Sequence, residues 1–440
     1  MYLQEVSFKN IKGFHDARLR FPKPTGAGNW HVILGDNGTG KTTILQAIAL
    51  SLLAADDLLK HPEDWVRQGT LHGKCTAKFA GIGPQQFKAE SAFTVAPEAK
   101  DGSLLLKDPG LLRFSPPALS SGVYRTAGDP PLLVAGYGAL RRLATGGASS
   151  RKRRTLDDLV GSLFNPAYEL TDLEDWLQRL DYIAKDGARQ GRDRHAAQES
   201  LASICRVVDS LLPQDPAFAF AGVDSRGAIF KGPRGEQLSL KNLSEGYRAI
   251  FGLAVDLMYT ANLIAPLDSI FALDAGGTPY VNLAGIVLID EVDTHLHPKW
   301  QQLIGPYLQR AFPKVQFIVT THSPFVAQAA TEGGLFVLEW TPGGVTVDQP
   351  PSSVQTLPAE EILESPVFGL ETTRRPEIEQ DLQEYTRLKA QAEAGTLQAA
   401  EKRRLQALTK KLKPALPPPG SAEETLKEIE RRIREAGKQP

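Results

Sequence analysis

Cysteine is scarce in this chain of 440 residues, and the scarcity excludes two classes of protein. The sequence has 2 cysteines, Cys75 and Cys205, and no CxxC pair. Zinc hooks and disulfide frameworks both require paired cysteines. We therefore exclude both classes and expect a protein of a reducing compartment.

Long apolar runs are also missing. The longest run, from Ile44 to Ala55, is interrupted by Gln46 and Ser51 and is shorter than the ~20 residues of a membrane-spanning helix. The opening segment, MYLQEVSFKN, has no apolar core like that of a signal peptide. We expect a cytoplasmic protein without a membrane partner.

Neither sign of charge dominates the chain. It has 50 Lys and Arg residues against 51 Asp and Glu residues, a formal net charge of -1. This balance argues against a protein that coats nucleic acid by bulk electrostatics. A basic cluster, Arg151 to Arg154, follows the flexible segment Thr145 to Ser150. The cluster suits contacts with DNA phosphates and equally suits a solvated loop, so DNA stays an open partner.

The chain instead has short apolar strands that alternate with helices. Beyond about residue 155 the pattern turns helical, and Thr171-x-x-Glu174 has the spacing of a capping box. Continuous apolar runs such as Trp30 to Leu34 are typical of buried parallel strands. The expected strands are Tyr2 to Lys9, Ala17 to Phe21, Trp30 to Leu34, Leu132 to Ala135, Gly285 to Ile289 and Val315 to Val319, and a helix is expected from Lys41 to about Ala55.

The strongest motif is a glycine-rich loop between the strand that ends at Leu34 and the helix that begins at Lys41. Its sequence fits G-x-x-x-x-G-K-[ST] in the required strand–loop–helix context. Backbone N–H groups of such a loop surround the phosphates of a nucleotide, the lysine adds a cation and the following hydroxyl binds Mg²⁺. We call residues 35–42 the phosphate loop. The residues expected to hold ATP are Gly35, Asn37, Gly38, Thr39, Gly40, Lys41, Thr42 and Thr43.

A second motif places two carboxylates after a buried strand. Asp290 and Glu291 follow the apolar run Gly285 to Ile289, at the strand edge where open α/β sheets bind ligands. We expect Asp290 to hold Mg²⁺ together with Thr42. Glu291 is expected to polarise the attacking water as the catalytic base.

Two further segments complete the pattern. Leu243-Ser244-Glu245-Gly246 opens an apolar-faced helix, and Thr321-His322-Ser323 follows another buried strand. With the phosphate loop and the Asp-Glu strand, these segments occur in the order found in ABC-type ATPases. The chain resembles the soluble branch of that family, which contains the SMC and RecF-like proteins. We call residues 243–248 the signature segment.

The resemblance implies a nucleotide site shared by two subunits. In this family the signature segment covers the γ-phosphate held by another subunit, so Ser244 and Gly246 would complete a partner's site. It also implies that His322 contacts the γ-phosphate and that Lys12 lies near the nucleotide, so the catalytic set would be Lys41, Glu291 and His322. Plain structural roles remain as alternatives: an N-cap for Ser244, a strand-end histidine for His322 and a surface lysine for Lys12.

The chain departs from the family pattern at two places. The glutamine that usually senses Mg²⁺ cannot be located. The strand from Leu132 leads instead into Gly136 to Arg142, so either an arginine acts there or the glutamine is missing. His295-x-His297 follows the Asp-Glu strand, but two histidines without a third ligand are a poor metal site.

Within this family the chain looks like a stand-alone bacterial group. The segments Leu288 to Trp300, Ser244 to Ile250 and Val319 to Phe325 resemble the ATPases of the Septu anti-phage system and of retron-linked systems. The resemblance implies an HNH-type nuclease subunit as partner. A RecF-like DNA-repair ATPase that loads other proteins is the alternative. A transporter subunit, a nuclease with a Toprim domain and an SMC protein with long coiled-coil arms fit less well.

These observations predict an α/β fold with an ABC-type P-loop ATPase head and an α-helical C-terminal extension. The head is expected over residues 1–340, with a β-rich phosphate-loop lobe over 1–145, a helical signature lobe over 155–280, and the Asp-Glu strand and His322 within 281–340. Residues 341–440 are expected to bind partners or to build a homo-oligomer, either a dimer or an assembly of dimers. The expected cofactors are ATP and Mg²⁺.

Overall fold

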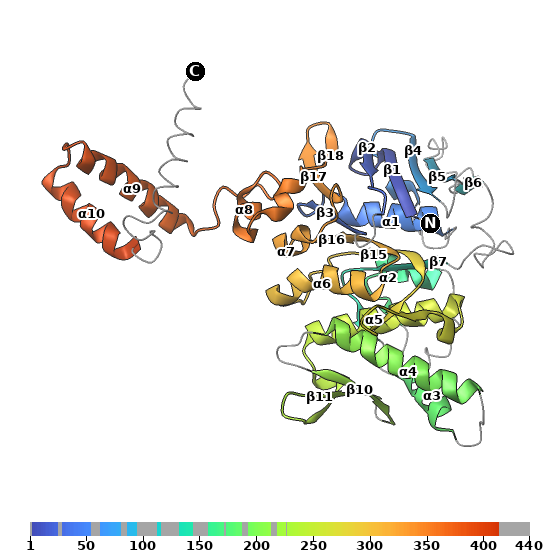
Figure 1. The fold of residues 1–440 in the computed structure, drawn as a ribbon. Helices are drawn as coiled ribbons and strands as arrows, with labels where there is room; N and C mark the ends of the chain where they lie inside the picture. Colours follow the sequence, from blue (N-terminus) through green and yellow to red (C-terminus); the bar gives the residue numbers. More distant parts are fainter. Residues whose placement is uncertain are drawn as a thin grey trace. The chain divides into compact units, whose positions relative to one another are not determined.

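The computed structural model describes residues 2–24, 29–53, 62–80, 86–94, 112–115, 132–143, 157–170, 173–186, 192–212, 218–225 and 227–412. The chain divides into two compact units, Met1–Ile362 and Leu363–Pro440. The first unit contains two large sheets and a helical lobe (Figure 1).

A six-stranded sheet with the order β18-β17-β3-β16-β15-β7 forms the centre of the first unit. Its strands are parallel except for β18, which pairs antiparallel with β17. Four of its strands match the expected apolar runs and confirm the prediction of an α/β fold: β3 (Trp30–Gly35), β7 (Leu132–Tyr137), β15 (Ala284–Ile289) and β16 (Val315–Thr320). The other two, β17 (Leu335–Thr341) and β18 (Gly344–Asp348), lie outside the expected strands.

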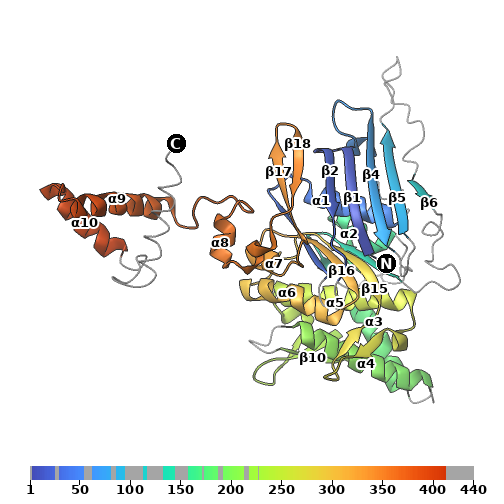
Figure 2. The same ribbon diagram turned by 45° about the horizontal axis from the view of Figure 1, so that its top comes forward.

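A second sheet, with the order β2-β1-β4-β5-β6, is antiparallel throughout. Figure 2 shows it beside the central sheet, with helix α1 (Lys41–Leu52) next to both. The helix confirms the prediction of a helical segment after the phosphate loop, although it ends earlier than Ala55. The strands are β1 (Tyr2–Ile11), β2 (Phe14–Arg20), β4 (His72–Ala80), β5 (Gln86–Thr94) and β6 (Leu112–Ser115).

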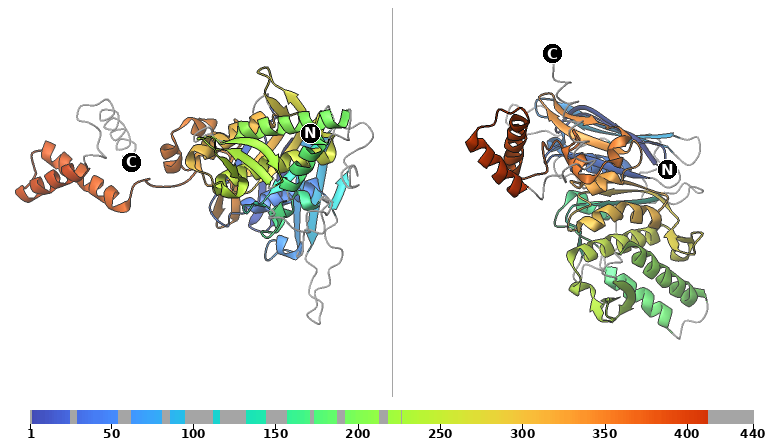
Figure 3. Two further views of the ribbon diagram at one scale, coloured as in Figure 1. Left: turned by 90° about the horizontal axis from the view of Figure 1, so that it is seen from below. Right: turned by 60° about the vertical axis from the view of Figure 1, so that its left-hand side comes forward.

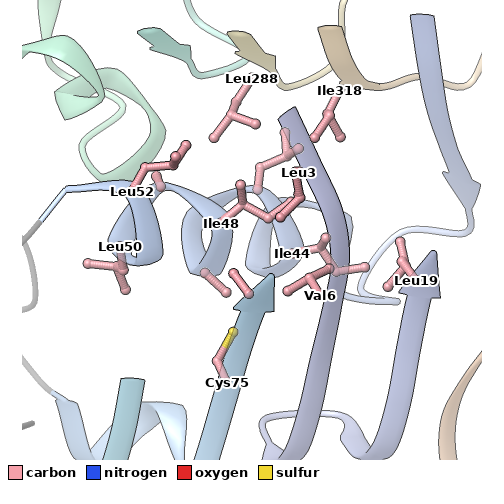
Figure 4. Packing of buried hydrophobic residues seen from close by; sticks show 14 of the residues in the cluster. Leu3, Val6, Leu19, Ile44, Ile48, Leu50, Leu52, Cys75, Leu288 and Ile318 are labelled. Carbon is pink, nitrogen blue, oxygen red and sulfur yellow. The ribbon is translucent and has the colours of Figure 1, made fainter. Parts of the chain in front are cut away.

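Helix α1 packs between the two sheets and forms the main core. Ile44 and Ile48 lie between Leu288 and Ile318 of the central sheet and Val6 of the antiparallel sheet (Figure 4). Full burial of one such side chain contributes about 1.5–3 kcal/mol. The core therefore fixes the beginning of α1, and with it the phosphate loop, against both sheets.

The helical lobe is built on α3 (Leu173–Lys185), α4 (Arg192–Leu211) and α5 (Glu245–Ile264) (Figures 1 and 2). The predicted capping box includes Thr171, which lies outside the described residues. The carboxylate of Glu174 accepts a 2.8 Å hydrogen bond from the backbone N–H of Ala228. The lobe also contains the small sheet of β10 (Ala219–Asp224), β11 (Gly227–Lys231) and β12 (Gln237–Ser239).

The first unit also contains further helices and strands, most of them short. They are α2 (Gly161–Phe164), β8 (Arg142–Leu143), β9 (Glu169–Leu170), β13 (Phe271–Leu273), β14 (Pro279–Val281), α6 (Pro298–Ala311), α7 (Pro324–Gln328) and α8 (Ala359–Glu364). No helix among the described residues is long and apolar enough to cross a membrane.

The expected boundary at residue 340 is too early. Residue 340 lies inside β17, and β18 then extends the central sheet, so the first unit continues to Ile362. The second unit contains a helical hairpin of α9 (Pro376–Glu393) and α10 (Ala399–Leu412) (Figure 3). Leu388, Leu408 and Leu412 form its small buried core.

Candidate functional site

The phosphate loop lies between β3 and α1, and its backbone requires glycine at two positions. Gly35 and Gly40 have φ values of 147° and 93°, which side chains rarely tolerate. A methyl group on Gly35 would lie 2.7 Å from the carbonyl oxygen of Leu338, and one on Gly40 would lie 2.8 Å from the ring of Phe14. The tight loop therefore packs against β17 and against the β1–β2 hairpin.

The side chain of Lys41 is folded back onto the loop. Its Nζ donates hydrogen bonds to the carbonyl oxygens of Gly35 at 2.7 Å and Asp36 at 3.0 Å. Burial lowers the pKa of Lys41, and the carboxylates of Asp290 and Glu291 oppose that change. The lysine is thus a cation enclosed by the loop that an incoming phosphate would contact.

Thr42 and Asp290 join the phosphate loop to the Asp-Glu strand. The Thr42 hydroxyl donates a 2.7 Å hydrogen bond to Oδ2 of Asp290, and the Thr320 hydroxyl donates a 2.5 Å bond to Oδ1. Hydroxyl and carboxylate oxygens are hard donors of the kind that Mg²⁺ prefers. Thr42 and Asp290 therefore fit the role of Mg²⁺ ligands that the sequence predicts.

Glu291 is half-buried beside this pair, and its backbone is unusual. Its φ of 45° lies in the left-handed region, which is uncommon for a residue other than glycine. Its N–H donates to the Thr320 hydroxyl at 2.7 Å, and the Thr294 hydroxyl donates to its Oε2 at 3.1 Å. Thr320 therefore anchors the backbone of Glu291, and Thr294 contacts its carboxylate.

The segment after β16 meets the same edge of the sheet. The Thr321 hydroxyl donates a 2.5 Å hydrogen bond to Asp293, and the Ser323 hydroxyl donates a 2.8 Å bond to Gln301. His322 lies between these two anchored residues and its side chain is exposed. The structure thus places His322 at the sheet edge where Asp290 and Glu291 lie.

The signature segment opens α5 and contacts the segment after Glu291. Ser244 is the N-cap residue of α5, yet its exposed side chain makes no capping hydrogen bond. A methyl group on Gly246 would lie 2.6 Å from the ring of Trp300 and 2.9 Å from the carbonyl oxygen of His295. The ring of Tyr247 packs edge-on against Trp300, with the centroids 4.5 Å apart.

Lys12 lies in the β1–β2 turn with a φ of 44°. Its Nζ is 4.5 Å from the centre of the Trp65 ring, a cation–π contact. Burial lowers the pKa of Lys12, and the nearby carboxylate of Asp64 opposes the change. The turn reaches the phosphate loop through Phe14, which packs against Gly40.

The His295-x-His297 pair contacts the signature segment and the start of α6. His295 lies 3.2 Å from Glu245, and His297 accepts a hydrogen bond from the N–H of Lys299 at the start of α6. Within the described part of the chain, no group of three or more histidine, cysteine and acidic residues is placed to hold a metal ion. The basic cluster Arg151 to Arg154 lies outside the described residues.

Two contacts at the site join residues far apart in the sequence. Arg141 donates hydrogen bonds to the carbonyl oxygens of Asp290 at 2.9 Å and Glu291 at 3.3 Å. Tyr137 donates a 2.7 Å bond to Asp256 of α5. For Arg141 the sequence holds only a weak signal, namely an arginine where the Mg²⁺-sensing glutamine is usual. No sequence pattern indicates the Tyr137–Asp256 pair.

Comparisons with protein families agree with this site. Residues 5–67 match a family described as "AAA domain", and residues 149–327 match one described as "AAA domain, putative AbiEii toxin, Type IV TA system". The first range contains the phosphate loop. The second contains the signature segment, the Asp-Glu strand and His322.

Relatives of this chain come from bacterial Septu and retron systems. It is 27% identical to the "Septu protein PtuA" of Bacillus mycoides over 92% of this chain and 50% of that protein. It is 44% identical to the "Retron Ec83 probable ATPase" of Escherichia coli over 23% of this chain and 17% of that protein. The resemblance to the Septu and retron ATPases is confirmed. The chain spans about half the length of the PtuA relative.

Among solved structures, an SMC head domain from Thermotoga maritima matches with a TM-score of 0.44 and 17% identity. The match covers 80% of this chain and 99% of that one.

Proposed function

We propose that this chain is a Mg²⁺-dependent ATPase that hydrolyses ATP to ADP and phosphate. The observation that carries the proposal is the 2.7 Å hydrogen bond between Thr42 and Asp290, which joins the phosphate loop to the Asp-Glu strand. Glu291 follows directly, where a base for the attacking water is needed. The names of the retron relatives, which describe ATPases, support the same activity.

Each residue has a distinct role in this proposal. Backbone N–H groups of the phosphate loop bind the phosphates, and Lys41 leaves the carbonyls of Gly35 and Asp36 to pair with phosphate oxygens. Thr42 and Asp290 would hold Mg²⁺, which would supply positive charge against the phosphates. Glu291 orients water for attack, and His322 contacts the γ-phosphate from the exposed loop after β16.

We further propose that two copies of the chain share each nucleotide. Ser244 is exposed and its hydroxyl does not cap its own helix, so the hydroxyl can contact an anion at the positive end of α5. The γ-phosphate held by a second copy is such an anion. ATP binding would then draw two first units together, and hydrolysis would release them.

The biological role proposed is a switch for a nuclease partner in anti-phage defence. The support is the similarity to a Septu protein over 92% of this chain, and the partner expected from this resemblance is an HNH-type nuclease that acts on DNA. The second unit, Leu363–Pro440, is proposed to bind this partner or further copies of the chain.

Two substitutions test the ATPase. Lys41→Ala should abolish ATP binding, because it removes the cation of the phosphate loop. Glu291→Gln should keep ATP binding and lose hydrolysis, so that a dimer accumulates with MgATP. Equilibrium binding, phosphate release and mass photometry measure the three outcomes. Lys314→Ala and Glu332→Gln change exposed residues of the same types and should behave like the unchanged protein.

Three results would contradict the proposals separately. Normal turnover by Glu291→Gln means that another residue is the base. A monomer in saturating MgATP with Glu291→Gln means that the nucleotide is not shared. If a chain that ends at Ile362 still binds every partner in a pulldown, the second unit is not the docking region.

A further inference from the structure

Arg141 forms a fork around the backbone of Glu291. Its Nη1 donates to the carbonyl oxygen of Asp290 at 2.9 Å, and its Nη2 donates to the carbonyl oxygen of Glu291 at 3.3 Å. These two carbonyls belong to the peptide groups before and after the Cα atom of Glu291. A single planar guanidinium thus contacts both of the peptide planes whose orientation defines φ and ψ of Glu291.

Glu291 needs such support because its conformation is unfavourable. A left-handed backbone, here with φ of 45°, costs a residue other than glycine roughly 1–2 kcal/mol. Residues persist in such regions only where the surrounding structure holds them. The Thr320 hydroxyl holds the N–H of Glu291 at 2.7 Å, and Arg141 holds the carbonyl oxygens on both sides.

The electrostatic surroundings keep Arg141 charged. Burial lowers the pKa of Arg141 to about 10, and the carboxylates of Asp293, Asp290 and Glu291 oppose this decrease. The guanidinium therefore remains a cation at neutral pH. An ammonium group carries a point charge without the rigid fork, so lysine cannot reproduce both contacts in the same geometry.

We propose that Arg141 is a positioning residue that sets the direction of the Glu291 carboxylate by holding the two peptide groups around it. The role rests on the proposed ATPase function, because Glu291 acts there as the base. Arg141 itself contacts neither ATP nor the attacking water in this proposal. Its removal should therefore slow hydrolysis without weakening nucleotide binding.

The experiment compares Arg141→Gln, Arg141→Lys and the control Arg142→Gln in the full chain. Arg142 is the next residue and is exposed. Misplacement of a reacting group by about 1 Å costs on the order of 100-fold in rate. We expect kcat of Arg141→Gln to fall about 10- to 100-fold with an unchanged Kd for ATP, a smaller loss for Arg141→Lys, and no change for Arg142→Gln.

A double variant shows whether Arg141 acts through Glu291. If it does, Arg141→Gln combined with Glu291→Gln should be no slower than Glu291→Gln alone, because the two effects are not independent. A further loss in the double variant overturns the proposal. An unchanged kcat of Arg141→Gln also overturns the proposal. A Kd for ATP that rises in step with the loss of kcat overturns it too, because Arg141 would then be a nucleotide or Mg²⁺ contact.

Hydrogen exchange without nucleotide separates this inference from the ATPase itself. The N–H of Val292 donates to the carbonyl oxygen of Thr320 at 3.0 Å, and Arg141→Gln should speed its exchange relative to Arg142→Gln. If Arg141→Gln speeds the exchange but the unchanged protein does not hydrolyse ATP, the ATPase proposal is refuted and the positioning of the Glu291 backbone by Arg141 still holds. Unchanged exchange refutes the positioning role, whatever the activity. If Arg141→Gln does not fold, Arg141→Lys provides the same comparisons.

Discussion

The phenol of Tyr137 donates a 2.7 Å hydrogen bond to the carboxylate of Asp256, and both side chains are buried. Tyr137 ends β7 of the central sheet, and Asp256 lies in α5, the helix that begins at the signature segment. The carbonyl oxygen of Tyr137 also accepts the N–H of Asp290 at 2.8 Å. A single residue therefore contacts both the Asp-Glu strand and the signature helix.

Replacing Tyr137 by phenylalanine should destabilise the first unit. The substitution removes a buried hydrogen bond to a carboxylate and keeps the ring, so we expect a loss of about 1–3 kcal/mol in the free energy of unfolding. Urea denaturation measures it. Tyr182→Phe, at a tyrosine that is 67% exposed, is the control and should have no effect. An equal loss in both variants would show that the contact with Asp256 contributes nothing.

Ser244→Ala should separate activity from stability. An N-cap serine typically contributes about 1 kcal/mol, but the Ser244 side chain makes no capping bond. We expect Ser244→Ala to leave the midpoint of thermal unfolding unchanged and to lower ATP hydrolysis. Ser323→Ala is the matched comparison, because this serine bonds Gln301 and caps α7, and it should lower the midpoint.

Mixing two inactive variants tests whether the nucleotide is shared. A dimer of one Ser244→Ala chain and one Lys41→Ala chain has one site with an intact phosphate loop and an intact partner serine. Hydrolysis should therefore return when the two purified variants are combined. If the mixture stays as inactive as its components while mixed dimers form, Ser244 does not serve a partner's site.

Gly246→Ala should displace the start of the signature helix. The added methyl group would meet the Trp300 ring at 2.6 Å and the carbonyl oxygen of His295 at 2.9 Å, and such overpacking typically costs 1–3 kcal/mol. We expect lower stability and weaker ATP-dependent dimerisation. Gly276→Ala, where the nearest atom would be 3.4 Å away, should have neither effect.

The sequence predicted the features that depend on neighbouring residues. The phosphate loop requires glycines, a lysine and a threonine in one short segment, and the strand before Asp290 is a continuous apolar run, so both motifs are visible locally. Strands β3, β7, β15 and β16 follow from the same kind of pattern. Relations between distant segments carry no such pattern, and the hydrogen bond between Tyr137 and Asp256 illustrates this limit.

The boundary expected at residue 340 coincides with the end of the motifs, whereas the central sheet continues through β17 and β18. Motifs mark the residues that carry chemistry, but a sheet ends only where its last strand pairs. The carboxylate of Glu174 shows a second limit, because tertiary packing brings the N–H of Ala228 within 2.8 Å of it.

His31 should make the first unit sensitive to acid. Its side chain is fully buried in β3, and neither ring nitrogen has a hydrogen-bond partner among the described residues. Burial lowers the pKa of His31 from its ordinary value of 6.5 to about 3. Below pH 6.5 the unfolded chain binds a proton that the folded chain excludes, so stability falls by up to about 1.4 kcal/mol per pH unit.

Replacing His31 by leucine removes this titration. Urea denaturation at pH 7, 5.5 and 4.5 should show a steeper loss of stability for the unchanged protein than for His31→Leu, whatever the difference between them at pH 7. His15→Leu, at an exposed histidine of β2, should keep the slope of the unchanged protein. Parallel curves for all three proteins would mean that His31 takes up its proton equally well in the folded chain, and that its burial does not oppose the charge.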